Sequence, residues 1–176
     1  MKKITFLMLH LNYGGIERQT TLMINELCKL GYEIEILCVY DILGKSFYKL
    51  DENVKISYLV KGFPNKVKIL NCLKKFKLIS FFKEVNIAVK CLIAKYIELK
   101  KEIKNLNTDI IFSTRPEFSK MIKRKDTLNI SQEHSFSSDI NYLNYAKKCF
   151  KNINKVVVMT DKAKDIYVKN NVHGNI

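Results

Sequence analysis

The chain has 176 residues, of which 47% are hydrophobic, and a formal net charge of +14. This length supports one domain with a hydrophobic core and excludes two full-sized domains. No apolar run reaches the roughly 18 residues that a membrane span requires. The five cysteines are odd in number and contain no Cys-x-x-Cys pair, so the sequence favours neither a disulfide framework nor a metal site.

The first residues resemble an export signal only superficially. Their apolar run is about seven residues long, and no small-residue cleavage site follows it. Ile4–Leu9 instead predicts a first strand buried on both faces. We therefore expect a cytoplasmic protein.

The remaining chain alternates between strand-like and helix-like segments. Further strands are predicted at Ile34–Val39, Val54–Leu59, Asp109–Ser113, Thr127–Ser131 and Lys155–Met159. Helices are predicted at Ile16–Leu30, over a long region after Pro64, and at Tyr142–Phe150 and Asp161–Asn170. This alternation predicts an α/β fold, a Rossmann-like open parallel sheet with flanking helices.

The long helical region concentrates the positive charge. Residues 61–104 contain 12 lysines and three acids, Glu84, Glu98 and Glu102. In Val85–Leu106 the apolar residues share one face, which predicts a helix that covers the sheet. In the earlier part, Val67–Phe82, lysines surround aromatic residues, a pattern typical of helices on anionic membranes. The membrane contact would use Lys74, Lys75, Lys77, Phe81 and Phe82. The alternative is a structural helix with solvated lysines.

The junction after the first strand contains two adjacent glycines, Gly14 and Gly15. At this edge of a parallel sheet, glycines let the backbone approach a phosphate, and the following helix N-terminus favours an anion. The alternative is an ordinary tight turn. Glu17 and Arg18 follow as phosphate or acceptor contacts, or as surface charges of the first helical turn. Because they are adjacent, their side chains point to different sides of the helix.

The string Gly14-Gly15-Ile16-Glu17-Arg18, with the helix ending at Leu30-Gly31-Tyr32, resembles the opening of glycosyltransferase family 4. The variant with Ile-Glu-Arg resembles the polysaccharide-assembly branch. The resemblance implies the GT-B fold, in which this glycine loop abuts the diphosphate of the donor.

Glu133 and His134 follow a predicted strand at the same sheet edge, and Glu133 is a further candidate acceptor or phosphate contact. Taken alone, His134 reads as a solvated loop residue. The pair matches the Glu-His form of the branch, and the resemblance then implies that His134, the candidate catalytic residue, hydrogen-bonds the transferred sugar and is not a nucleophile. Lys155-Val-Val-Val-Met-Thr160 is similar to the last strand of the family's N-terminal domain, with Thr160 as a structural helix cap.

Arg115 is one of three arginines in a lysine-rich chain and follows another predicted strand. Arginine binds phosphate and carboxylate in a bidentate manner better than lysine does. Arg115 is therefore a candidate acceptor or phosphate contact, with a surface ion pair as the alternative. Pro116 suits the first turn of a following helix.

The resemblance implies a whole enzyme that transfers a sugar from a nucleotide-diphosphate donor to a glycan or lipid-linked acceptor in surface polysaccharide synthesis, with retention of configuration. It implies no cofactor and no metal. Residues 1–176 would be the N-terminal, acceptor-side domain, with the C-terminal nucleotide-sugar domain absent. We expect this isolated half to be inactive, and the protein to lie peripherally on the inner face of the cell membrane.

Three other functions are compatible with parts of the sequence. The net charge alone favours nucleic-acid binding, but no known motif supports it, and we expect no nucleic-acid partner. The second function is that of a non-catalytic membrane- or sugar-docking module. The third is that of a GT-B-fold sugar-nucleotide epimerase, although its catalytic carboxylates cannot be identified in this chain.

Overall fold

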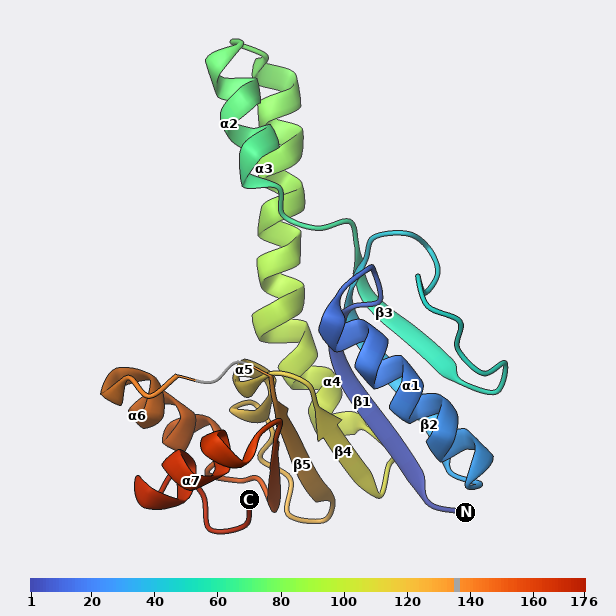
Figure 1. Cartoon of the computed structure of the whole chain (residues 1–176). Coiled ribbons are helices and arrows are strands. Elements are labelled where there is room, and N and C mark those ends of the chain that lie inside the picture. Colours follow the sequence, from blue (N-terminus) through green and yellow to red (C-terminus); the bar gives the residue numbers. More distant parts are fainter. Residues whose placement is uncertain (135–136) are drawn as a thin grey trace.

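The computed structural model describes residues 1–134 and 137–176 (Figure 1). In this part of the chain, six parallel strands form one sheet in the order β3-β2-β1-β4-β5-β6. The strands are β1 (Lys3–His10), β2 (Glu33–Asp41), β3 (Lys55–Lys61), β4 (Ile110–Ser113), β5 (Leu128–Glu133) and β6 (Lys155–Val158). The predicted α/β class with an open, Rossmann-like parallel sheet is confirmed.

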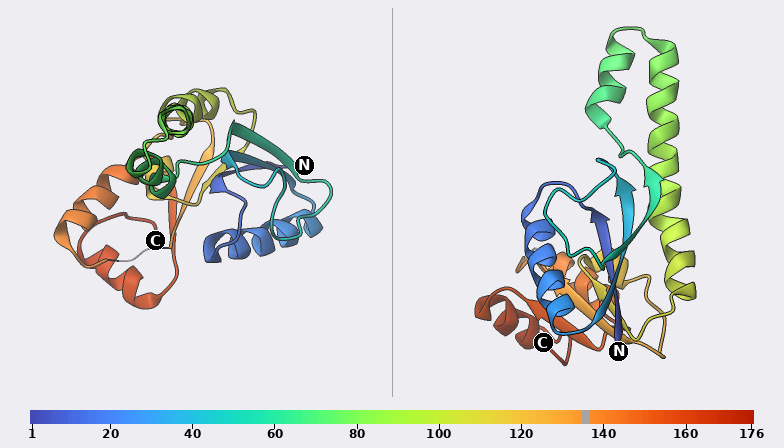
Figure 2. Two further views of the ribbon diagram at one scale, coloured as in Figure 1. Left: turned by 90° about the horizontal axis from the view of Figure 1, so that it is seen from above. Right: turned by 90° about the vertical axis from the view of Figure 1, so that its right-hand side faces the viewer.

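Helices cover the two faces of the sheet unequally, as the view from above in Figure 2 shows. One face packs against α1 (Gly15–Lys29), which contributes Ile24 to the core on that side. The other face packs against α4 (Leu99–Asn105), α5 (Pro116–Ser119), α6 (Ile140–Cys149) and α7 (Asp161–Lys169). Neighbouring residues of β1 alternate between the two cores: Phe6 lies in the first and Leu7 in the second. Since both faces are covered, the continuous apolar run of this strand is explained.

The boundaries of α1 agree with the sequence, but its buried face agrees only in part. Gly31 has φ +84°, and the amides of Gly31 and Tyr32 donate to the carbonyls of Cys28 and Leu27, so glycine ends the helix as predicted. The helical spacing of Leu22, Met23, Leu27 and Leu30 predicts one apolar face; Met23 and Leu27 pack against the core, whereas Leu22 and Leu30 are exposed. The buried positions include the polar residues Glu17, Thr20 and Thr21, which a search for apolar residues overlooks.

The region after Pro64 forms a helical hairpin of α2 (Lys66–Lys74) and α3 (Leu78–Ile93), which projects beyond the carboxyl edge of the sheet (Figures 1 and 2). No residue of α2 is buried, and in α3 the one buried residue is Cys91. These two helices therefore do not pack along the sheet. No helix in the described residues has the length and apolar character needed to cross a bilayer.

The apolar stripe predicted for Val85–Leu106 is wrong over most of its length. Val89, Leu92, Ile93 and Tyr96 are exposed, and the core side chains are Cys91, Ala94, Leu99 and Ile103. Between Ala94 and Leu99 the chain forms a π-helical turn, η1 (Ala94–Glu98), before it continues as α4. The extra residue of this turn explains why five positions separate those two buried residues.

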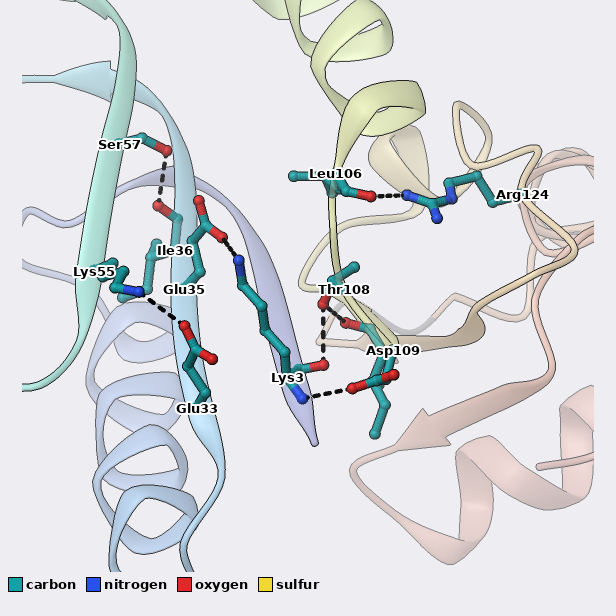
Figure 3. A network of polar contacts seen from close by, with 11 residues as sticks. Lys3, Glu33, Glu35, Ile36, Lys55, Ser57, Leu106, Thr108, Asp109 and Arg124 are labelled. Carbon is teal, nitrogen blue, oxygen red and sulfur yellow. Dashed lines mark hydrogen bonds and ion pairs between the residues drawn. The ribbon is translucent and has the colours of Figure 1, made fainter. Parts of the chain in front are cut away.

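Polar contacts join the strands at the amino edge of the sheet (Figure 3). The Lys3 ammonium lies 2.7 Å from the Glu35 carboxylate, and the Lys3 amide donates to Asp109 at 2.8 Å. The Thr108 hydroxyl donates to the Lys3 carbonyl at 3.0 Å. These contacts tie β1 to β2 and to the start of β4, so this edge is structural, and the opposite edge is left for ligands.

All five cysteines are free thiols. Cys38, Cys91 and Cys149 are buried, and Cys28 and Cys72 are half-buried. Burial raises the pKa of Cys38 to about 12, which keeps this thiol protonated and unreactive.

Candidate functional site

The sequence-predicted motifs meet at the carboxyl ends of β1, β4 and β5. The chain leaves β1 toward α1 on one face of the sheet and leaves β4 toward α5 on the other. A crevice opens where neighbouring strands diverge in this way, and open α/β sheets bind ligands there. The residues at this crevice are those that follow His10, Ser113 and Gln132.

The glycine turn is shaped by the side chain of Glu17. Gly14 has extended backbone, with φ 167°, so its conformation does not require glycine. A Cβ atom at Gly14 would instead lie 2.0 Å from Oε2 of Glu17. The Tyr48 hydroxyl, from the loop after β2, donates to the Gly14 carbonyl at 3.3 Å. Gly14 therefore makes room for a carboxylate of the protein itself.

Glu17 is buried, which excludes the alternative that its side chain is a surface charge of the first helical turn. Its Oε1 lies 3.3 Å from Nδ1 of His10, close enough for an ion pair but without the alignment of a hydrogen bond. Burial lowers the pKa of His10, Glu17 opposes the shift, and Arg115 adds to it. Arg18 is exposed on the other side of the helix, as expected from its adjacency to Glu17.

Gly15 differs from Gly14 because no neighbour occupies the space beside it. It is exposed, and a Cβ built there meets nothing within 4 Å. The free space lies at the first residue of α1, where the helix N-terminus favours negative charge. The backbone here is accessible to an anionic ligand.

A hollow of about 150 Å³ brings together the start of α1 and the ends of β4 and β5. It is lined by Ile16, Thr114, Arg115, Pro116, Glu117, Glu133, His134, Tyr142 and Tyr145. Ile16 directly follows Gly15, so the two motifs that the sequence placed at one cleft do converge on it.

His134 offers an unused polar atom to this hollow. Its Nε2 is buried and has no hydrogen-bond partner among residues 1–134 and 137–176. Burial, with a smaller contribution from the positive charge of Arg115, lowers the pKa of His134, so the imidazole is neutral near pH 7. A neutral imidazole can donate or accept one hydrogen bond at this nitrogen.

Arg115 precedes α5 and is half-buried. Within the described residues its guanidinium forms no ion pair, so the predicted alternative of a surface salt bridge is not observed. Its positive charge contributes to lowering the pKa of both His10 and His134. Arg115 thus supplies positive charge between the two histidines.

Glu133 is buried at the end of β5 and accepts a hydrogen bond from the Tyr142 hydroxyl at 2.7 Å. The Tyr167 hydroxyl lies 3.5 Å from the same oxygen. Burial, with the neighbouring carboxylate, raises the pKa of Tyr142, so it remains a donor. Tyr142 and Tyr145, like Tyr48 and His10, went unrecognised in the sequence, because only the fold places them beside the motifs.

The predicted membrane residues lie in the hairpin, away from the hollow. Lys74, Lys75, Lys77 and Phe82 are exposed, and Phe81 is half-buried against Phe82 with ring centroids 5.6 Å apart. Among the described residues, no group of three or more histidines, cysteines and acids could hold a metal ion.

Substitutions of the two glycines should differ in their effect on stability. Gly14→Ala should lower the free energy of unfolding by about 1–2 kcal/mol, because the buried Glu17 carboxylate must move away from His10. Gly15→Ala should change it by less than about 1 kcal/mol, because the site is open. Urea unfolding of both variants tests this. In a Glu17→Ala background the cost of Gly14→Ala should largely disappear; an unchanged cost would refute the proposed clash.

Comparison with known proteins gives matches in sequence and in structure. Over 113 residues, 64% of this chain and 26% of the relative, the chain is 29% identical to the GalNAc-α-(1→4)-GalNAc-α-(1→3)-diNAcBac-PP-undecaprenol α-1,4-N-acetyl-D-galactosaminyltransferase of Campylobacter jejuni. The chain thus spans about a quarter of the length of this curated relative. No family model matches the chain.

Two solved structures of sucrose-phosphate synthase from Thermosynechococcus elongatus share the fold. In the first, 99% of this chain aligns to 47% of the synthase, with a TM-score of 0.60 and 14% identity. In the second, 99% of this chain aligns to 84% of the solved synthase chain, with a TM-score of 0.53 and 15% identity. The comparisons therefore relate the chain to a glycosyltransferase in sequence and to a sucrose-phosphate synthase in fold.

Proposed function

We propose that residues 1–176 form the N-terminal, acceptor-side half of a GT-B-fold glycosyltransferase of the family 4 type. The observation that carries the proposal is the buried Nε2 of His134, which has no partner within the described residues, while His134 lines one hollow with Arg115 and the residue after Gly15. The sequence similarity to a galactosaminyltransferase supports the same reaction class.

In this proposal the diphosphate of the nucleotide-sugar donor lies against the backbone of Gly15, because the Glu17 carboxylate already occupies the space beside Gly14. Three features support this position: the open space at Gly15, the helix N-terminus behind it, and the guanidinium of Arg115, which forms no ion pair within the described residues. Negative charge develops on the leaving diphosphate during transfer, and preorganised donors and dipoles stabilise it best. The protein's own groups therefore supply electrostatic stabilisation without a cofactor.

His134 then holds the transferred sugar. A neutral imidazole with a free nitrogen can hydrogen-bond a sugar hydroxyl, which would fix the anomeric carbon relative to the acceptor. Glu133 accepts hydrogen bonds from Tyr142 and contributes by keeping the strand end in place. Neither residue needs to act as a nucleophile, in keeping with a retaining transfer of the family 4 type.

The acceptor is proposed to be lipid-linked and to be used at the cytoplasmic face of a membrane in surface polysaccharide synthesis. The name of the Campylobacter relative includes an undecaprenol-diphosphate-linked glycan. The hairpin supports membrane contact in this chain, because residues 66–93 carry seven lysines and one glutamate beside exposed apolar side chains. Phe76 and Ile79 at its tip are 88% and 89% exposed.

A comparison of activities tests the proposal. The full-length natural protein should transfer sugar from a nucleotide-diphosphate donor to a lipid-diphosphate acceptor at ordinary enzyme rates, about 1 s⁻¹ or more. Residues 1–176 alone should turn over far more slowly, because a second domain would provide most donor contacts. Radiolabelled sugar transfer measures both. Equal rates would refute the assignment of residues 1–176 as one half of the enzyme. Absence of transfer by the full-length protein with every donor would favour a docking module.

A further inference from the structure

A second hollow adjoins the first on the side of the hairpin. It has a volume of about 400 Å³ and is lined by Tyr96, Lys100, Glu117, Lys120, Met121, Lys123 and Tyr145. Glu117 and Tyr145 line both hollows, so the two are neighbours. A path from His134 to the second hollow would pass these two residues and α5, which lies beside the long helix below the hairpin (Figure 1).

The charge of this second hollow, termed here the lysine hollow, is strongly positive. Lys100, Lys120 and Lys123 form no ion pair with any residue in the described parts of the chain. The acid of the lining, Glu117, is already paired with Lys95 at 3.3 Å. Three lysines that form no ion pair in the described chain therefore line one cavity, and such a concentration of positive charge attracts multivalent anions.

The lining comes from elements whose geometry is unusual for a plain structural surface. Tyr96 belongs to the π-helical turn, and such turns occur frequently at functional sites. Tyr96 and Tyr145 are both exposed, and they line the hollow together with the lysines. Phenol and ammonium groups are hydrogen-bond donors at neutral pH, and phosphate oxygens are acceptors.

We infer that the lysine hollow binds the phosphate groups of the acceptor substrate. The inference rests on the proposed function, in which the donor diphosphate occupies the opposite end of the path, at Gly15. An acceptor held by its phosphates in the lysine hollow would extend its sugar toward His134 through the shared residues Glu117 and Tyr145. The ligand class is a diphosphate attached to a glycan and a lipid chain.

Binding of soluble probes to the 176-residue chain tests the site independently of transfer. Isothermal titration with farnesyl diphosphate should show binding that inorganic pyrophosphate displaces. The double variant Lys120→Glu/Lys123→Glu should weaken this binding by at least about tenfold, since charge-assisted hydrogen bonds are lost and like charges are introduced. Its circular dichroism should match that of the parent chain, because both lysines are exposed.

The control is Lys162→Glu/Lys169→Glu on α7, which changes the net charge equally at exposed positions that line neither hollow. It should leave the affinity for farnesyl diphosphate within about twofold, because exposed charges outside the site are screened by salt. Equal losses in both double variants would overturn the inference in favour of unspecific charge attraction. Failure of pyrophosphate to compete would also overturn it.

UDP separates the two phosphate sources. Its binding should weaken with Gly15→Leu and persist in Lys120→Glu/Lys123→Glu. The reverse pattern would assign the lysine hollow to the donor and overturn the inference. In contrast, a full-length protein without transferase activity would refute the proposed function, whatever the outcome of these titrations.

Discussion

Gly15→Leu in the full-length natural protein is expected to lower kcat/KM for sugar transfer by about 100-fold or more while the fold stays intact. A Cβ atom at Gly15 would meet no atom of the described chain within 4 Å, so the start of a side chain there is not opposed by the protein itself. In the proposed complex the same side chain would hold the donor diphosphate away from the backbone and from the N-terminus of α1. The loss should therefore appear in activity without a loss of stability.

Steady-state kinetics with thermal unfolding of the same samples check this result. Gly174→Leu is the matched control, since Gly174 is also a glycine with nothing within 4 Å and does not line the hollow. It should retain activity within about twofold, the range usual for neutral surface changes. Normal kinetics for Gly15→Leu would show that the glycine pair is an ordinary turn.

His134→Ala should act on the same step, with a loss of about 10- to 100-fold in kcat/KM, the range for one hydrogen bond at a reacting group. His134→Gln, which retains a hydrogen-bonding side chain, should recover part of the activity. Since the Nε2 atom of His134 has no partner in the described chain, the variant loses no structural hydrogen bond at that atom. Wild-type kinetics for His134→Ala would reduce it to a structural residue.

Lipid binding by the hairpin is expected to depend on its lysines. Lys74→Glu/Lys75→Glu/Lys77→Glu should weaken binding to anionic vesicles by about 100-fold at low salt, at about 1 kcal/mol for each lysine near the surface. The charge-matched control is Lys162→Glu/Lys164→Glu/Lys169→Glu on the exposed side of α7, which should bind nearly as the parent does. Co-sedimentation with neutral and anionic vesicles measures the effect. Equal recovery with both vesicle types would make the hairpin an ordinary structural element.

Phe76 provides a second test of the hairpin, because folding alone would favour glycine there. It has φ 52°, and the amides of Phe76 and Lys77 donate to the carbonyls of Leu73 and Cys72, a C-terminal helix motif in which glycine is preferred. Phe76→Gly should therefore maintain or raise the stability of the hairpin but weaken vesicle binding by about tenfold, as one exposed aromatic ring is lost. A variant that binds as tightly as the parent would contradict insertion of the tip.

The sequence by itself determined the features that depend on local patterns. Continuous apolar runs such as Ile4–Leu9 predicted strands buried on both faces, and the sheet has them. Gly31 ends α1, Pro116 begins a helix, and the Thr160 side chain accepts from the Ala163 amide as a cap. Each of these depends on the backbone preferences of one or two residues, which a sequence displays directly.

Tertiary structure decided the rest, because those features depend on contacts between residues far apart in the chain. The π-helical turn at Ala94–Glu98 changes which face of the long helix is buried, and no residue in that turn predicts a π-helix from the sequence. The burial of Glu17 beside His10 follows from the packing of α1 on β1. The strand order brings Arg115 and His134 to the start of α1, and the packing of α5 and α6 places Glu117 and Tyr145 in the lining of both hollows. Local propensity carries no information on such pairings, since the free energy that selects them comes from closing long loops and burying shared surfaces.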